Sequence, residues 1–163
     1  MEEAPVVMPH LQLILNYRVL QNRDAIFESM HSETFDPTRE VILESQPDPK
    51  PAESNNNGTA RITATTTDSL TIEADVEQPS ILLITDGYAA SWRTVSLPGS
   101  TQAHYDLLPA NYILRAVALA TGHHLLRVEY RPITFEIGKW ISLISMVAFL
   151  AALVRCARAS TLL

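Results

Sequence analysis

The chain has little cysteine and little positive charge, and each shortage excludes a class of protein. Cys156 is the only cysteine among 163 residues, so no disulfide framework can form within the chain. Residues 1–132 hold 9 lysines and arginines against 17 acidic residues. An acidic body repels phosphate backbones, and no run of basic residues interleaved with aromatics occurs. We therefore expect no nucleic-acid partner.

Several motifs with known chemistry are also absent. The chain has no G-x-x-x-x-G-K or G-x-G-x-x-G loop for nucleotide phosphates and no G-x-S-x-G turn for a nucleophilic serine. His123 and His124 are adjacent, so on a strand they point to opposite faces, and no further ligand follows at metal-site spacing. We predict no catalytic residue, no metal and no cofactor for this chain.

The first ten residues, "MEEAPVVMPH", lack the basic and apolar regions of a signal peptide. We assign residues 1–9 to an N-terminal tail. If the body lies outside the cytoplasm, another segment of the chain must direct it there.

Strand-like alternation fills most of residues 10–132. In "LTIEADVE" the apolar residues Leu70, Ile72, Ala74 and Val76 alternate with polar ones, which is typical of a half-buried strand. The four successive apolar residues of "ILLIT" instead favour a central strand covered on both faces. A short helix with Asp24 as its N-cap is the exception. Further strands are expected at 11–20, 40–44, 61–65, 91–97, 102–107, 112–119 and 123–131.

This pattern predicts an all-β fold, an antiparallel, jelly-roll-like β-sandwich of about seven or eight strands over residues 10–132. Within it, residues 45–59, "SQPDPKPAESNNNGT", contain three prolines and three consecutive asparagines. Such a segment cannot bury enough apolar surface to order itself, so we predict an exposed loop.

The longest apolar run lies near the C-terminus. Trp140 to Val154, "WISLISMVAFLAALV", carries no charge, and Glu136 and Lys139 precede it at a spacing that lets them pair at a membrane interface. An amphipathic core helix is the alternative, but only two serines interrupt the apolar surface before Arg155. We predict a transmembrane helix over 133–157 and a cytoplasmic tail over 158–163, because positive charge follows the run.

Two segments resemble the C-terminal region of bacterial YfhO-type membrane proteins. They are "ILLITDGYAASWRTV" and "ANYILRAVALATGHHLLRVEYRPITFEIGKWISLIS", and the second leads from "AN" through a strand into a final membrane helix. "LNYRVL" and "FDPTREVILE" match the family's earlier strand and turn, so the resemblance covers residues 10–154 in order. Ala89, Ala90 and Ser91 stand where the family tends to have Pro-Gly, and "LPGSTQAHYD" replaces its usual hairpin.

The resemblance implies a larger protein than this chain. YfhO-type proteins are polytopic and resemble the GT-C class of lipid-linked-sugar glycosyltransferases, whose catalytic acid is expected in an early extracytoplasmic loop. The resemblance thus implies a non-catalytic extracytoplasmic domain with its last membrane helix, either a fragment or a separate subunit. Its partners would be the bilayer and a polytopic glycosyltransferase core or a cell-envelope glycan. Its location would be the bacterial cytoplasmic membrane, with the sandwich outside and the C-terminus inside.

One stretch carries residues suited to sugar binding. "TDGYAASWR" gathers Asp86, Tyr88, Trp92 and Arg93 after a buried strand, and these offer aromatic faces and charged hydrogen-bonding groups. The alternative is structural, with Trp92 as an anchor of the core and Asp86-Gly87 as a turn. A membrane-anchored carbohydrate-binding module is therefore the second function expected, and a structural remnant of a broken gene is the third.

Overall fold

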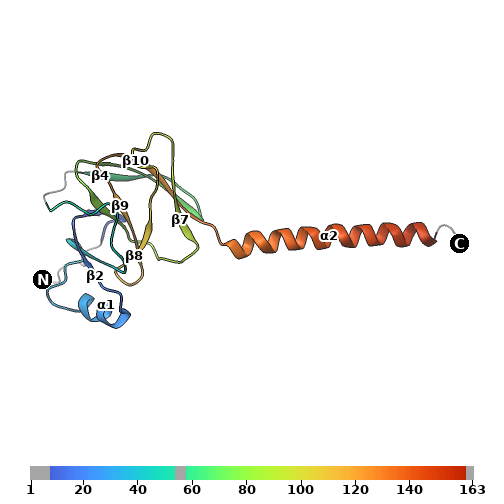
Figure 1. The fold of residues 1–163 in the computed structure, drawn as a ribbon, viewed down its shortest axis with the longest axis horizontal. Helices are drawn as coiled ribbons and strands as arrows, with labels where there is room; N and C mark the ends of the chain where they lie inside the picture. Colours follow the sequence, from blue (N-terminus) through green and yellow to red (C-terminus); the bar gives the residue numbers. More distant parts are fainter. Residues whose placement is uncertain (1–7, 54–57, 161–163) are drawn as a thin grey trace, which may run out of the picture. The chain divides into compact units, whose positions relative to one another are not determined.

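The computed structural model describes residues 8–53 and 58–160, and the predicted fold class is confirmed: two β-sheets face each other and one long C-terminal helix follows them in the sequence (Figure 1). The chain divides into two units, which meet in sequence at Tyr130 and Arg131. The described strands are β1 Leu11–Ile14, β2 Asn16–Val19, β3 Glu40–Leu43, β4 Thr59–Thr65, β5 Ser69–Val76, β6 Ser80–Ile84, β7 Trp92–Ser96, β8 Leu107–Ala110, β9 Leu114–Leu119 and β10 Gly122–Tyr130. The described helices are α1 Arg23–Met30 and α2 Ile133–Ser160.

The strands form one six-stranded and one four-stranded sheet. The larger sheet has the order β1-β6-β9-β8-β3-β2, and the smaller has the order β4-β5-β10-β7. Neighbouring strands are antiparallel except for β2 and β3, which are parallel. The prediction of a purely antiparallel sandwich is wrong for this pair, because helix α1 lies between the two strands in the sequence and reverses the chain.

The main core lies between the two sheets. Leu70, Ile72, Ala74 and Val76 of β5 point inward, as their alternation predicts, and Ile72 has no exposed surface. They meet residues from the larger sheet, so this core is built from both. Its other buried members are Leu82, Ile84, Tyr105, Val117, Leu119, Leu126 and Val128.

Strand β6 is buried on both faces, which confirms the prediction for "ILLIT". Leu82 and Ile84 face the core between the sheets, whereas Ile81 and Leu83 belong to a second apolar cluster with Val41 and other residues of the larger sheet. A strand covered on both sides is rich in apolar residues. All five residues of β6 are buried, and four of them are apolar, with Ser80 as the exception.

The N-terminal segments differ from the prediction in detail. Residues 11–20 form two strands, not one, and β1 and β2 lie at opposite edges of the larger sheet. The N-cap of α1 is Asn22, whose side chain accepts a hydrogen bond from the Asp24 backbone N–H at 2.9 Å. Asp24, the predicted cap, lies in the first turn. Asparagine and aspartate cap helices about equally well, so composition alone could not separate them.

One loop prediction and one strand prediction need correction. In the described part of the loop predicted at 45–59, Pro47 is buried and the Ala52 backbone N–H donates to the Pro79 carbonyl at 2.8 Å, so that part packs on the domain although most of its polar residues are exposed. The strand predicted at 102–107 begins only at Leu107. In the segment between β7 and β8, side chains of β7 bind the backbone instead, as in the 2.7 Å hydrogen bond from Ser96 Oγ to the Gln102 carbonyl.

Asn111 joins strands β3 and β8 through its side chain and its backbone. Its Oδ1 accepts from the Ile42 backbone N–H at 2.8 Å, and its own N–H donates to the Ile42 carbonyl at 2.8 Å. The residue is 2% exposed and has a φ of 43°, a left-handed conformation that asparagine tolerates better than most residues. The amide thus replaces one step of a β-ladder.

Helix α2 is apolar around its whole circumference. Residues Ile133–Ala152 form a stretch of 20 residues with a mean hydropathy of 1.6, and none of this stretch is buried. At about 1.5 Å per residue this length matches the roughly 30 Å hydrocarbon core of a bilayer. Near its start, Lys139 Nζ lies 2.7 Å from Glu136 Oε2. In the described part of the chain, one helix is therefore long and apolar enough to cross a membrane.

Candidate functional site

A pocket at one end of the sandwich brings together two of the four residues predicted to bind sugar. Asp86, just after β6, and Trp92, at the start of β7, line the same cavity of about 310 Å³. This is the end at which β6 finishes and β9 begins. The other lining residues are His10, Thr65, Thr66, Thr67, Ser69, Leu70, Gly87 and Arg115.

Arg115 is the buried cation of this pocket. In β9 it continues the row of inward-pointing residues formed by Val117 and Leu119, and it is 4% exposed. Its guanidinium carbon lies 3.7 Å from the centroid of the Trp92 ring, and its Nε donates to the Gly87 carbonyl at 2.8 Å. The Nη1 atom is buried and has no hydrogen-bond partner among the residues that the structure describes. A buried charged donor left unpaired is costly, so this atom requires an explanation.

Asp86 supplies the opposing charge. Its Oδ1 lies 3.0 Å from His10 Nε2, and its Oδ2 lies 4.0 Å from Arg115 Nη1. The second distance is an ion-pair separation and too long for a hydrogen bond. Burial lowers the pKa of the Arg115 guanidinium from its usual value, while the Asp86 carboxylate acts in the opposite direction. Arginine titrates so far above neutrality that Arg115 keeps its positive charge.

Trp92 is held by its neighbours and contributes to the core. Arg115 covers one face of the indole, and the Tyr130 ring lies 5.3 Å away at an interplanar angle of 57°. The ring also packs, partly buried, against the cluster between the sheets, as the structural alternative expected. A sugar ring therefore cannot stack on the face that Arg115 occupies.

The other two predicted residues lie elsewhere. Arg93 points to the outer face of the smaller sheet, where its Nε donates to Glu129 Oε1 at 2.8 Å across the β7–β10 pair. Tyr88 is 37% exposed, and its backbone N–H donates to the Ile113 carbonyl at 2.7 Å. Neither lines the pocket. Adjacent strand residues point to opposite faces, which separates Arg93 from Trp92.

Sequence analysis did not single out Arg115, although the pattern of its strand indicates that it faces the core. In "LRAVAL" the residues Arg115, Val117 and Leu119 share one face of the strand, and the last two are core residues. An arginine in a core-facing row needs a buried partner. That partner, Asp86, follows the end of β6, which is the neighbour of β9 in the sheet. Only the pairing of these two strands shows that Asp86 and Arg115 are close.

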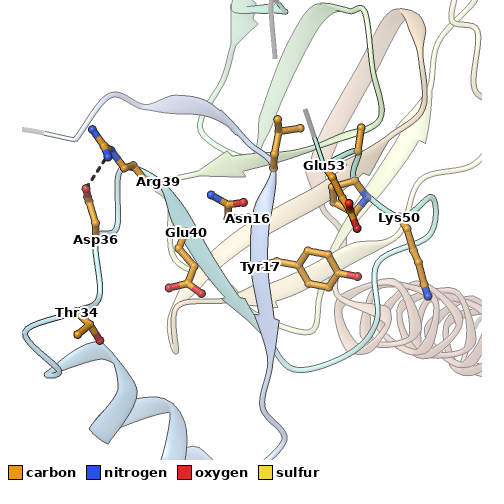
Figure 2. Close-up of a pocket in the computed structure, with 11 residues that line it drawn as sticks. Asn16, Tyr17, Thr34, Asp36, Arg39, Glu40, Lys50 and Glu53 are labelled. Carbon is orange, nitrogen blue, oxygen red and sulfur yellow. Dashed lines mark ion pairs between the residues drawn. The ribbon is translucent and has the colours of Figure 1, made fainter. Parts of the chain in front are cut away.

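A wider hollow lies beside strands β2 and β3. It measures about 830 Å³, and Figure 2 shows Asp36 and Arg39 on one side of the strands and Lys50 on the other. Its charges are largely satisfied within the chain: Glu40 makes two 2.6 Å contacts with Arg18, and Asp36 lies 3.5 Å from Arg39. Two neutralised pairs in an open hollow do not define a chemistry.

The smaller sheet carries one group of residues with metal-ligand chemistry. Glu73, Asp75 and His123 offer ligand atoms within 4.8 Å of one another on strands β5 and β10. Sequence spacing missed this group because its members come from two strands. His123 Nδ1 already contacts Asp75 at 2.8 Å, and Arg61 donates to Glu73 at 2.8 Å. We assign no metal to this exposed cluster.

His124 belongs to a buried hydrogen-bond chain. It has no exposed surface, its Nε2 lies 2.8 Å from the Ala120 carbonyl, and its Nδ1 lies 2.8 Å from Tyr105 Oη. The carbonyl can only accept, so Nε2 carries the proton and Nδ1 accepts from the Tyr105 hydroxyl. Burial lowers the pKa of His124 and raises the pKa of Tyr105. Both groups are therefore neutral and structural.

No protein-family model, no curated protein and no solved structure matches this chain.

Proposed function

We propose that this chain is a membrane-anchored β-sandwich that acts as a non-catalytic extracytoplasmic domain beside a polytopic glycosyltransferase core in the bacterial cytoplasmic membrane. The resemblance of residues 10–154 to the C-terminal region of YfhO-type proteins supports the choice of partner. The domain would pack against the transferase or steer its acceptor polymer.

The observation that carries the anchoring is the uncovered apolar surface of α2. Burying one large apolar side chain contributes about 1.5–3 kcal/mol, whereas a whole domain is stable by only about 5–15 kcal/mol. If α2 stayed in water, the free energy lost by leaving these side chains exposed would thus exceed the stability of a typical domain. Insertion into a bilayer removes this apolar surface from water. The large apolar residues exposed on α2 are Ile133, Phe135, Ile137, Trp140, Ile141, Leu143, Ile144, Met146, Val147, Phe149 and Leu150.

The charges that flank the apolar run support the orientation. Glu136 and Lys139 pair before it, Trp140 suits an interface, and Arg155 and Arg158 follow it in the sequence. Positive charge favours the cytoplasmic side, so the sandwich lies outside and the C-terminus inside. The sequence lacks the nucleophile and nucleotide motifs named above, which fits an accessory role.

Alkaline carbonate extraction of membranes from bacteria producing the full chain tests the anchoring. We expect the chain to stay in the membrane pellet, and a variant with Ile144→Arg and Val147→Arg in α2 to be extracted, because each arginine costs about 3 kcal/mol at a helix centre. Extraction of the parental chain would contradict the proposal.

A second assay tests the non-catalytic role. The full chain, purified in detergent, is incubated with lipid-linked sugar donors and acceptor polymer. We expect no transfer above a no-protein control. Transfer by this chain alone would overturn the accessory role and leave the anchoring intact.

A further inference from the structure

We infer that the pocket of His10, Asp86, Trp92 and Arg115 binds a neutral, hydroxyl-rich ligand the size of one sugar ring. One hydroxyl of the ligand lies between Arg115 Nη1 and Asp86 Oδ2. This site differs from the one expected from the sequence, because Arg115 takes the place of Arg93 and Tyr88 is not part of it.

The unpaired Nη1 of Arg115 is the first argument. The arginine side chain is 5% exposed, its Nε donates to Gly87 and its guanidinium lies against Trp92. Among residues 8–53 and 58–160, however, Nη1 has no hydrogen-bond partner. Buried guanidinium groups are normally satisfied, because the desolvated donor loses its water without replacement. A ligand oxygen would remove this cost, so Nη1 is a donor that favours binding.

The separation between the two charges is the second argument. Nη1 and Asp86 Oδ2 lie 4.0 Å apart, which leaves no direct hydrogen bond. An oxygen about 2.8 Å from both atoms fits between them, with an angle of roughly 90° at that oxygen. A hydroxyl accepts from the guanidinium and donates to the carboxylate at the same time.

The charge balance excludes the obvious alternative, an anion. Asp86 opposes Arg115 within the pocket, and His10 is the only other ionisable side chain among the described residues that line it. Phosphate or carboxylate would be brought against the Asp86 carboxylate, which repels it. A neutral ligand avoids that repulsion.

The size of the cavity sets the extent of the ligand. Its volume of about 310 Å³ lies at the lower end of the range of roughly 300–1,000 Å³ found for ligand pockets. One pyranose fits, whereas an extended oligosaccharide would leave most of its length outside. Arg115 covers one indole face, so Trp92 offers its remaining surface as the apolar wall.

Tryptophan fluorescence of the full chain tests the site. Trp140→Phe leaves Trp92 as the sole reporter, and an amine-oxide detergent avoids competition from sugar head groups. Glucose, galactose, mannose, N-acetylglucosamine and inorganic phosphate are titrated separately into the millimolar range. We expect at least one sugar to change the Trp92 emission saturably and phosphate to have no effect.

Three further variants locate the binding. Asp86→Asn and Arg115→Lys should each weaken the affinity for that sugar by about tenfold or more, because each removes part of a charge-assisted pair. Arg93→Lys, on the outer face, should leave the affinity unchanged. Circular dichroism checks that each variant keeps its fold, and the half-exposed Asp86 provides a test even if Arg115→Lys unfolds.

Three outcomes would overturn the inference. They are no response to any sugar, a tighter response to phosphate than to sugars, and sugar binding that Asp86→Asn leaves unchanged. None of them bears on membrane anchoring, which extraction measures independently.

Discussion

Replacing Asn111 by alanine should destabilise the sandwich far more than its place in a short turn suggests. The Asn111 amide accepts from the Ile42 backbone N–H at 2.8 Å, and Ile42 is 1% exposed, so no water can replace the lost acceptor. Strands β3 and β8 share only the pair Leu43 and Ala110 in their ladder. The side chain of Asn111 therefore carries much of the link between them.

Two contributions set the magnitude. A buried backbone N–H left unsatisfied costs about 1–3 kcal/mol. The φ of 43° at Asn111 adds about 1 kcal/mol, because alanine tolerates left-handed backbone less well than asparagine does. The Asn111→Ala variant should thus lose about 2–4 kcal/mol, which lowers the melting temperature by on the order of 10 °C.

Urea unfolding of the full chain in detergent, followed by Trp92 fluorescence in a Trp140→Phe background, measures the loss. Asn111→Gly keeps the backbone conformation accessible but still removes the acceptor, so it should fall between the parent and Asn111→Ala. Asn16→Ala, at an exposed asparagine of β2, is the matched control and should change the free energy of unfolding by about 0.5 kcal/mol or less.

A loss below about 1 kcal/mol in Asn111→Ala would refute the reasoning, because it would mean that the Ile42 N–H finds another partner. Equal losses of unfolding free energy in the alanine and glycine variants would refute only the backbone contribution and leave the hydrogen-bond contribution intact.

Three other predictions concern the core, the surface and pH. Ile72→Ala, at a side chain with no exposed surface, should cost about 2–5 kcal/mol in the same urea assay, and a cost under 1 kcal/mol would contradict the core assignment. Arg93→Ala, which removes a half-exposed partner of Glu129, should cost about 1 kcal/mol or less, and a larger loss would mean that this pair is not a surface contact. Burial lowers the pKa of His124 in the folded state. The stability that neutral His124 contributes is therefore complete above the ordinary pKa of about 6.5 and is lost as pH falls below it. The free energy of unfolding measured in urea should therefore fall below pH 6.5, by up to about 1.4 kcal/mol per pH unit. This fall should be shallower in His124→Gln, and equal slopes in the two proteins would contradict the prediction.

The parts of the fold that the sequence predicted are those in which side-chain period decides the structure. β5 alternates between apolar and polar residues, and four successive apolar residues follow Ser80 in β6, so their burial follows from local pattern. The apolar surface of α2 is likewise a property of one continuous segment. In each case the environment of a residue follows from its position within its own element.

The sequence was less informative where a distant partner decides the structure. Nothing in "LQLILNYRVL" shows that β1 pairs with β6 while β2 pairs with β3. These different partners are the reason that the segment forms two strands. Residues 102–106 were predicted to belong to a strand, yet side chains of β7 donate to the Gln102 and Tyr105 backbone carbonyls. Local propensity cannot weigh such competing partners.

The candidate site shows the same division. Asp86 and Trp92 were found because they are close in sequence, and Tyr88 and Arg93 were grouped with them for the same reason. The structure separates the second pair and adds Arg115, which lies more than twenty residues along the chain on a neighbouring strand. A core-facing arginine was readable in the pattern, but its partner was not.

Thiol labelling tests the central claim, that α2 anchors an extracytoplasmic sandwich, most directly. Two forms of the full chain are produced in bacteria and treated as spheroplasts with a membrane-impermeant maleimide. One keeps Cys156 as its only thiol, and the other carries Cys156→Ser with Ser45→Cys at an exposed residue of the sandwich. We expect the thiol at position 45 to react in intact spheroplasts and Cys156 to react only after permeabilisation. Reaction of Cys156 in intact spheroplasts, or protection of position 45, would contradict the account.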